Sequence, residues 1–321
     1  MLNLPRKVLP GVWQITLPLP FELSSVNVYL VELHQGWMMV DCGLASSDSY
    51  RELIRQMNEA GVGLDGITEI LLTHTHPDHV GQAKRLIAET GARISFSRDE
   101  ELQLHRAALS SDQPEWLDHV LDQAGVPQEM VRHIERSFAM IKPNFQPLTP
   151  DRTLEAGQTI QARCGELRLL HTPGHSPGHI CLYNEQHRTL FCGDTVLEKI
   201  TPNIAWLPER DALGEFFTSL DEVGGLLVDQ LLPGHGTPFA GHRGWIEATR
   251  RHHDVRCGQL LASLSAGPRT AHEMVPSIWP RPLAPFHHRF AVFEVLAHLE
   301  YLRRQERVFA EAADGSLLWR V

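Results

Sequence analysis

The sequence has 321 residues, of which 42% are hydrophobic and 21% are charged, and these proportions are ordinary for a globular protein with a sizeable core. The net charge of −10 argues against a general binder of polyanions, so nucleic acid is disfavoured as a partner, although a local basic patch would survive this average. No apolar run approaches the length of a bilayer span and the first residues lack a signal pattern, so we expect no membrane association and a cytoplasmic location.

The first third of the chain is predicted to alternate between strands and helices. Three strands are expected between residues 12 and 40, connected by turns that contain proline and glycine. Asp41 follows the third strand, and two interpretations are open: it hydrogen-bonds a metal ligand, or it is a solvated loop carboxylate. A helix is predicted from Ser47 or Asp48 to Ala60, and further strands are predicted up to residues 93–96.

Residues 69–81 carry the clearest functional signal. The apolar run at 70–72 is typical of a buried strand that ends at Thr73. Side chains alternate along a strand, so His74 and His76 are predicted to point to the same side and to reach one ion. Asp78 and His79 follow at the start of a helix predicted over 80–90 and could serve a second ion. Imidazole and carboxylate are the ligands that Zn, Mn or Fe select, so a metal site is favoured over a polar loop.

Residues 98–148 are predicted to form a helical insertion. Three helical segments are expected, over 99–109, 114–124 and 128–140, and no convincing strand lies among them. Insertions of this size in α/β enzymes are more often a lid or a wall of the substrate pocket than part of the core.

Three later apolar strands also end at residue types that bind metals. His175 lies in a loop punctuated by proline and glycine, Asp194 follows the strand at 189–192, and His235 stands between two glycines after a strand predicted over 226–232. A buried carboxylate such as Asp194 needs compensation, which a cation would supply. His179 has two interpretations: it supports a ligand by hydrogen bonding, or the loop merely caps it.

In combination, these motifs resemble the metallo-β-lactamase superfamily from about Val12 to Trp245. The motifs are His74-x-His76-x-Asp78-His79, the loop Thr-Pro-Gly-His-Ser-Pro-Gly-His around His175, Gly193-Asp194, and Pro233-Gly234-His235-Gly236. The resemblance implies an α/β fold, namely an αββα sandwich with two divalent metal ions at one edge of two packed sheets. It also implies that His74, His76 and His175 hold one ion, that Asp78, His79 and His235 hold the other, and that Asp194 bridges them.

The last 76 residues have a different character. Three helices and a hairpin are predicted, which is similar to the winged helix attached to several hydrolases of this superfamily. This region contains ten arginines and eight acidic residues, so its net charge is only +2. A packing or pocket-completing role is therefore favoured over nucleic-acid binding. We therefore predict a metal-hydrolase domain over 1–245 and a winged-helix-like domain over 246–321. His287 and Arg289 are weak candidates for substrate binding, and otherwise they only decorate a helix start.

The predicted activity is hydrolysis of a small thioester or ester by a hydroxide that bridges two metal ions, as in the hydroxyacylglutathione hydrolases and thioesterases that the sequence resembles. Zinc is favoured, with manganese or iron as alternatives, and Asp78 is also predicted to orient the nucleophile or carry a proton. Lactone hydrolysis, phosphodiester cleavage of RNA and iron-dependent oxygen chemistry remain open. Hydrolysis of β-lactams is the least expected activity, because Asp194 occupies the position where the main zinc β-lactamases have cysteine. The sequence does not identify the substrate or the oligomeric state.

Overall fold

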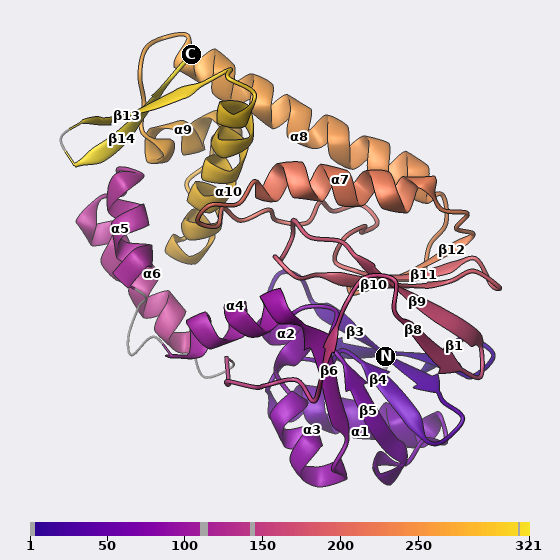
Figure 1. Ribbon diagram of the computed structural model, residues 1–321. Helices are drawn as coiled ribbons and strands as arrows, with labels where there is room; N and C mark the ends of the chain where they lie inside the picture. Colours follow the sequence, from indigo (N-terminus) through magenta and orange to yellow (C-terminus); the bar gives the residue numbers. More distant parts are fainter. Residues whose placement is uncertain (1–3, 110–114, 142–144, 314) are drawn as a thin grey trace.

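The computed structural model describes residues 4–109, 115–141, 145–313 and 315–321, which form two stacked sheets with helices on their outer faces (Figure 1). The first sheet has seven strands in the order of the chain, and its second half, from β4 to β7, is parallel. Its strands are β1 (Arg6–Leu9), β2 (Val12–Pro18), β3 (Ser25–Glu32), β4 (Trp37–Val40), β5 (Ile67–Leu71), β6 (Arg93–Ser97) and β7 (Arg152–Leu154).

The second sheet has five strands in the order β12-β11-β10-β9-β8. All neighbours in it are antiparallel except β11 and β12, which are parallel and therefore end at the same edge. The strands are β8 (Thr159–Ala162), β9 (Gly165–His171), β10 (Ile180–Asn184), β11 (Thr189–Gly193) and β12 (Gln230–Pro233).

Apolar side chains from both sheets meet between them. Tyr29 of β3 contacts Phe191 of β11 edge to face, with the ring centroids 5.4 Å apart, and both side chains are buried. The outer face of the first sheet packs against α1 (Ser47–Glu59) and α3 (Ala83–Thr90), and that of the second sheet against α7 (Ala212–Gly225). The expected αββα layering is therefore confirmed.

Several predicted elements differ locally from the structure. The helix expected over 80–90 is divided into α2 (Pro77–Val80) and α3, because the N–H of Gln82 donates to the carbonyl of Gly43 and does not continue the turn. The strand expected from 226 begins only at Gln230, since α7 extends to Gly225. The short edge strand β1 was not predicted, and a single turn of 3₁₀ helix, η1 (Leu64–Gly66), precedes β5.

The insertion and the C-terminal region lie side by side at one end of the molecule (Figure 1). The insertion contains α4 (Arg98–Leu109), α5 (Glu115–Gln123) and α6 (Gln128–Ile141), while Pro114, the predicted start of its second helix, is outside the described residues. The C-terminal region contains α8 (His242–Leu264), α9 (Ala271–Ile278), α10 (Pro285–Arg304), β13 (Phe309–Ala313) and β14 (Ser316–Arg320). Helix α6 packs against α10. Helix α8 runs through residue 245, where a domain boundary was predicted, and this boundary stays a prediction.

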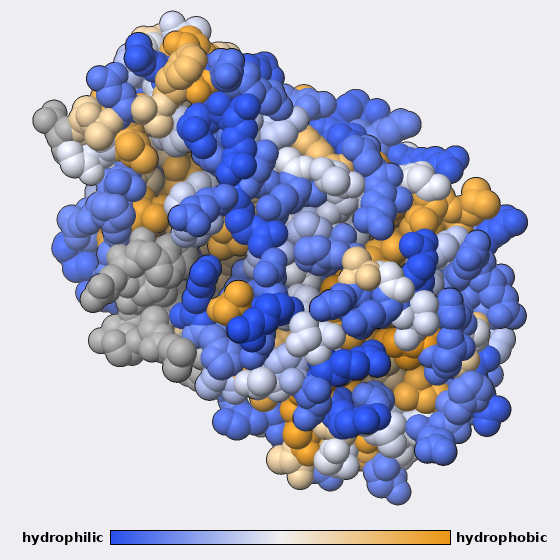
Figure 2. Space-filling model, viewed as in Figure 1, coloured by the Kyte–Doolittle hydropathy of each residue, from blue (hydrophilic) through white to orange (hydrophobic). Residues whose placement is uncertain are grey.

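The molecular surface is mainly polar on the face shown in Figure 2, with several separate groups of hydrophobic residues, one of which lies near the hairpin β13–β14. Phe309 of that hairpin is 51% exposed. Among the described helices, none is both long enough and apolar enough to cross a membrane.

Candidate metal centre

The seven side chains predicted to bind metal come together at one edge of the two sheets. They lie on the segments that follow β5, β9, β11 and β12, and all of these segments open toward the same place because the strands end there. The seven are His74, His76, Asp78, His79, His175, Asp194 and His235.

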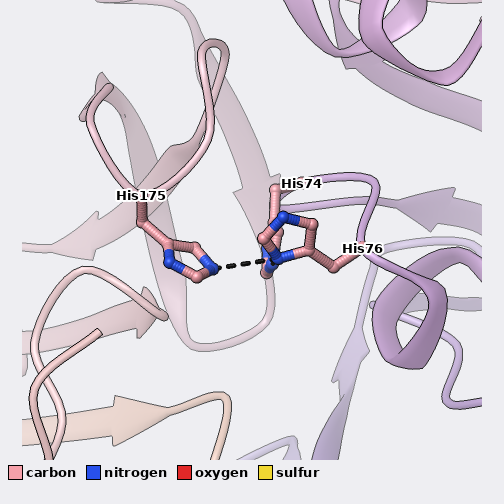
Figure 3. A group of neighbouring side chains, drawn as sticks. All are labelled: His74, His76 and His175. Carbon is pink, nitrogen blue, oxygen red and sulfur yellow. Dashed lines mark hydrogen bonds between the residues drawn. The ribbon is translucent and has the colours of Figure 1, made fainter. Parts of the chain in front are cut away.

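His74, His76 and His175 form the first group (Figure 3). The Nδ1 atom of His76 is 3.1 Å from Nε2 of His74 and 3.0 Å from Nε2 of His175. Ligand nitrogens around one tetrahedral zinc ion are about 3.3 Å apart, so the three nitrogens are spaced for a common ion. β5 ends at Leu71, two residues before the predicted end at Thr73, and the rings of His74 and His76 lie together on the segment that follows it.

Asp78, His79 and His235 form the second group. Nε2 of His235 lies 3.4 Å from Oδ2 of Asp78, and Nε2 of His79 lies 3.9 Å from the same oxygen. Asp194 stands between the two groups: its Oδ2 is 3.6 Å from Nε2 of His175 and 3.3 Å from Nε2 of His235. One carboxylate oxygen therefore faces both groups.

Two buried atoms of the centre have no hydrogen-bond partner within the described part of the chain. They are Nε2 of His79 and Oδ1 of Asp194, on side chains that are 0% and 8% exposed. A buried polar atom without a partner is costly, and it points to a group that the protein is built to receive. The donor set of imidazoles and carboxylates fits divalent cations such as zinc.

In four of the imidazoles, Nδ1 faces away from the centre and makes a contact with another part of the protein. Nδ1 of His79 donates to Oδ2 of Asp41 at 2.9 Å, and Nδ1 of His74 lies 3.0 Å from Oγ1 of Thr73. Main-chain carbonyls serve the other two: Asn203 accepts from His175 at 2.9 Å, and Ser25 accepts from His235 at 2.7 Å. These contacts leave Nε2 of each ring directed into the centre.

The local environment sets opposite protonation tendencies in the two groups. Burial lowers the pKa of His74 and His76 well below the usual histidine value, and it also lowers that of His175. Burial opposes charge on His79 too, but Asp41, Asp194 and Asp78 outweigh it and raise the pKa. Against its own burial, Asp194 has a pKa well below the usual carboxyl range because His235 and His79 are beside it. The first group is therefore neutral at pH 7 and presents its lone pairs.

The sequence left two interpretations each for Asp41 and His179, and in the structure both side chains make specific contacts at the centre. Asp41 is buried, has a positive φ of 61°, and accepts from the main-chain N and Oγ1 of Thr73 as well as from His79. His179 is buried, and its Nε2 accepts from the main-chain N of Asp194 at 3.1 Å. Thr172 and Thr195 contact the Nδ1 atom of His179, so this imidazole supports the Asp194 loop.

The two weak candidates for substrate binding lie on the first turns of α10. His287 is exposed, and the guanidinium of Arg289 lies 5.8 Å from the ring centroid of Phe293. Their role in substrate binding stays a prediction.

Sequence reasoning missed Glu100, a buried carboxylate at the start of α4 that contacts two of the ligand-bearing segments. It also missed the link from Asn203 to Glu294 of α10, in which Nδ2 of Asn203 donates to Oε2 of Glu294 at 2.7 Å. Glu100 occurs among other polar residues of a predicted helix, so no local pattern could have identified it. Glu294, in contrast, stands between Phe293 and Val295 on the apolar face of its helix, where a charged residue is a signal for a buried polar contact.

Comparison with known proteins agrees with this arrangement. Residues 22–250 match the family model described as the metallo-beta-lactamase superfamily, and residues 257–320 match one described as the metallo-beta-lactamase-like, C-terminal domain. A metallo-beta-lactamase family protein from Thermus thermophilus has a similar crystal structure, with 30% identity and a TM-score of 0.85. The similarity covers 98% of this chain and 99% of that one.

Two relatives of the chain have names that state an enzymatic activity. The probable metallo-hydrolase YqjP of Bacillus subtilis is 25% identical over 92% of this chain and 92% of its own length. The acyl-coenzyme A thioesterase MBLAC2 of Gallus gallus is 29% identical over 68% of this chain and 76% of its own length.

Proposed function

Because the chain belongs to the metallo-β-lactamase superfamily and is a metal-dependent hydrolase, we propose that it hydrolyses a small thioester or ester at the centre described above. The observation that carries the proposal is the position of Asp194, whose Oδ2 lies within 3.6 Å of one histidine from each group. A shared carboxylate between two sets of nitrogen ligands is what a centre for two ions requires.

The proposed ligand assignment follows the two groups. His74, His76 and His175 would hold one divalent ion, Asp78, His79 and His235 the other, and Asp194 would bridge them. Zinc is favoured and manganese or iron are alternatives, since imidazole and carboxylate suit all three. When bound, two such ions lower the pKa of a shared water toward neutrality and polarise an acyl carbonyl, so that hydroxide can attack it.

Asp78 is the proposed proton carrier. Its side chain is 20% exposed, against 8% for Asp194, so Asp78 is the more accessible of these two carboxylates. From there it would accept a proton from the attacking water and return it to the leaving thiolate or alkoxide. Asp78→Asn is expected to keep both ions and to lower kcat. Unchanged kcat with full metal content would refute this role.

The thioester class is favoured by the relative named as an acyl-coenzyme A thioesterase and by the acidic surface, which disfavours RNA. Glutathione thioesters belong to the same chemical class. For the C-terminal domain we propose a winged-helix topology with a packing role, because it contains three helices and one hairpin, and α10 packs on α6, α7, α8 and α9.

The test is a substrate screen with the zinc-loaded protein. The panel holds acyl-coenzyme A thioesters, glutathione thioesters, lactones, bis-p-nitrophenyl phosphate and single-stranded RNA. Turnover of the thioesters supports the proposal, turnover confined to the lactones would favour the lactonase alternative, and turnover confined to the phosphodiesters would contradict it. Activity that survives in the double variant His76→Ala/Asp194→Ala would refute metal-dependent hydrolysis at this centre.

A further inference from the structure

Glu100 is a carboxylate buried between two segments that carry metal-site residues. It lies in the first turn of α4, and its exposed fraction is 0%. Within the described part of the chain, no ion pair compensates its charge. A buried carboxylate of this kind is tolerated only where hydrogen bonds replace its hydration.

The two oxygens of Glu100 bind different segments. Oε2 accepts from the main-chain N of Thr75 at 2.7 Å and from Oγ1 of Thr75 at 2.6 Å. Oε1 accepts from the main-chain N of Gly178 at 2.8 Å. Thr75 stands between His74 and His76, and Gly178 lies in the loop that carries His175. One side chain therefore joins the two halves of the three-histidine group.

Neighbouring contacts hold α4 in this position. Oγ of Ser97 donates to the carbonyl of Gly178 at 2.7 Å, so both main-chain groups of Gly178 are bound by this turn. A Cβ at residue 178 would lie 2.1 Å from Oγ of Ser97, which explains why glycine is required there. Arg210 adds a second link, since its guanidinium binds Asp99 at 2.8 Å and the carbonyl of Pro177 at 3.1 Å.

We infer that Glu100 is a positioning residue, which sets the separation of the His74–His76 segment from the His175 loop so that their three nitrogens close on one divalent ion. The inference rests on the metal assignment proposed above. Loss of such a supporting contact costs about 10- to 100-fold in metal affinity.

Glu100→Gln tests the inference, and the next residue offers a matched control. An amide has one acceptor oxygen and one NH₂ group, so either Thr75 or Gly178 would face a donor where it now finds an acceptor. Glu101→Gln makes the same change on the same turn, at a side chain whose ion-pair partner among the described residues is the exposed Arg98. Both variants and the parent protein are stripped of metal and titrated with Zn²⁺, and the bound ions are counted by mass spectrometry of the metal.

The parent and Glu101→Gln are expected to bind two ions each. Glu100→Gln is expected to keep the ion of the Asp78, His79 and His235 group and to lose the other to a chelator about 10- to 100-fold more readily. Titration with Co²⁺ gives a second readout, because only the absorption bands of the three-histidine site should fade. General destabilisation would weaken both sites together.

Equal retention of both ions by folded Glu100→Gln would overturn the inference and leave the proposed hydrolase intact. A parent protein that takes up no Zn²⁺ would overturn both. If Glu100→Gln does not fold, Thr75→Val serves in its place, since it removes the hydroxyl donor and keeps the main-chain N–H. A smaller but still selective loss of one ion is then expected, and unchanged retention would overturn the inference.

Discussion

The imidazoles of the metal centre are oriented by contacts of different chemical kinds. His175 and His235 donate to main-chain carbonyls, which no substitution removes directly, whereas His79 donates to the carboxylate of Asp41. An anionic acceptor strengthens the hydrogen bond and makes the opposite nitrogen a better metal ligand. Asp41 is therefore the point at which this set of contacts can be tested by mutation.

Asp41→Asn is expected to weaken the ion at Asp78, His79 and His235 by about 10- to 100-fold, because a neutral amide is a poorer acceptor for the N–H of His79. Asparagine tolerates the positive φ of 61° at this position, so the backbone should be unchanged. Zinc retention against a chelator gives the measurement. Asp48→Asn, on the exposed first turn of α1, is the control, and equal retention in the two variants would show that Asp41 has no such role.

Gly234→Ala is expected to disrupt the centre directly. An added Cβ would lie 2.2 Å from Oδ1 of Asp194 and 3.0 Å from Cε1 of His79, so the Asp194 carboxylate would have to move. We expect a loss of hydrolytic activity of at least about 10-fold, which is roughly 1.4 kcal/mol of transition-state stabilisation. Gly258→Ala in α8 is the control, since nothing lies within 4 Å of its Cβ. Full activity of Gly234→Ala would contradict the geometry of this loop.

At the scale of elements, Asn203 links helix α10 to the metal centre by hydrogen bonds. Glu294 of α10 accepts from Nδ2 of Asn203 and also pairs with Arg256 of α8, while the carbonyl of Asn203 accepts from His175. The C-terminal helices are therefore connected to a metal-site histidine by two successive hydrogen bonds.

Asn203→Ala is expected to loosen the ion of the three-histidine group several-fold, because it removes the anchor to Glu294 and keeps the carbonyl that holds His175. Asn58→Ala, at an exposed position of α1, provides the comparison. Metal retention and thermal unfolding are measured together. Lower stability with unchanged metal retention would mean that the contact serves only to pack α10.

Helices and strands could be predicted where a short stretch of sequence carries a characteristic pattern. Apolar runs that end in histidine or aspartate located β5, β11 and the His175 loop. Glu100 could not be found in this way, because it lies in the run Arg98-Asp99-Glu100-Glu101, which is typical of a solvated helix start. Its role depends on Thr75 and Gly178, which are distant in the chain.

At the scale of the whole molecule, buried neutral histidines should make stability depend on pH. Burial and, to a lesser extent, the nearby Arg256 together lower the pKa of His253 to about 2 and that of His298 to about 3. The unfolded chain binds these protons near pH 6.5, so the stability that the neutral rings contribute is present above that value and is lost as the pH falls toward 3.

Metal-free protein should therefore lose up to about 1.4 kcal/mol of unfolding free energy per histidine for each pH unit below about 6. Urea unfolding at pH 7.5, 6.0 and 5.0 measures this slope. His253→Leu, which keeps an apolar contact with Phe216 and Phe217, is expected to give a shallower slope than the parent. Parallel slopes would show that His253 is not one of the groups responsible.

Helix α8 connects the sheets to the C-terminal domain without a break over its 23 residues, and no proline interrupts it. A helix of that length is a stiff rod of about 35 Å, whereas a flexible linker would allow free rotation. The C-terminal domain therefore cannot swing as a tethered module. Force applied to its far end would be transmitted along α8 to the sandwich, so the two parts should respond mechanically as one body.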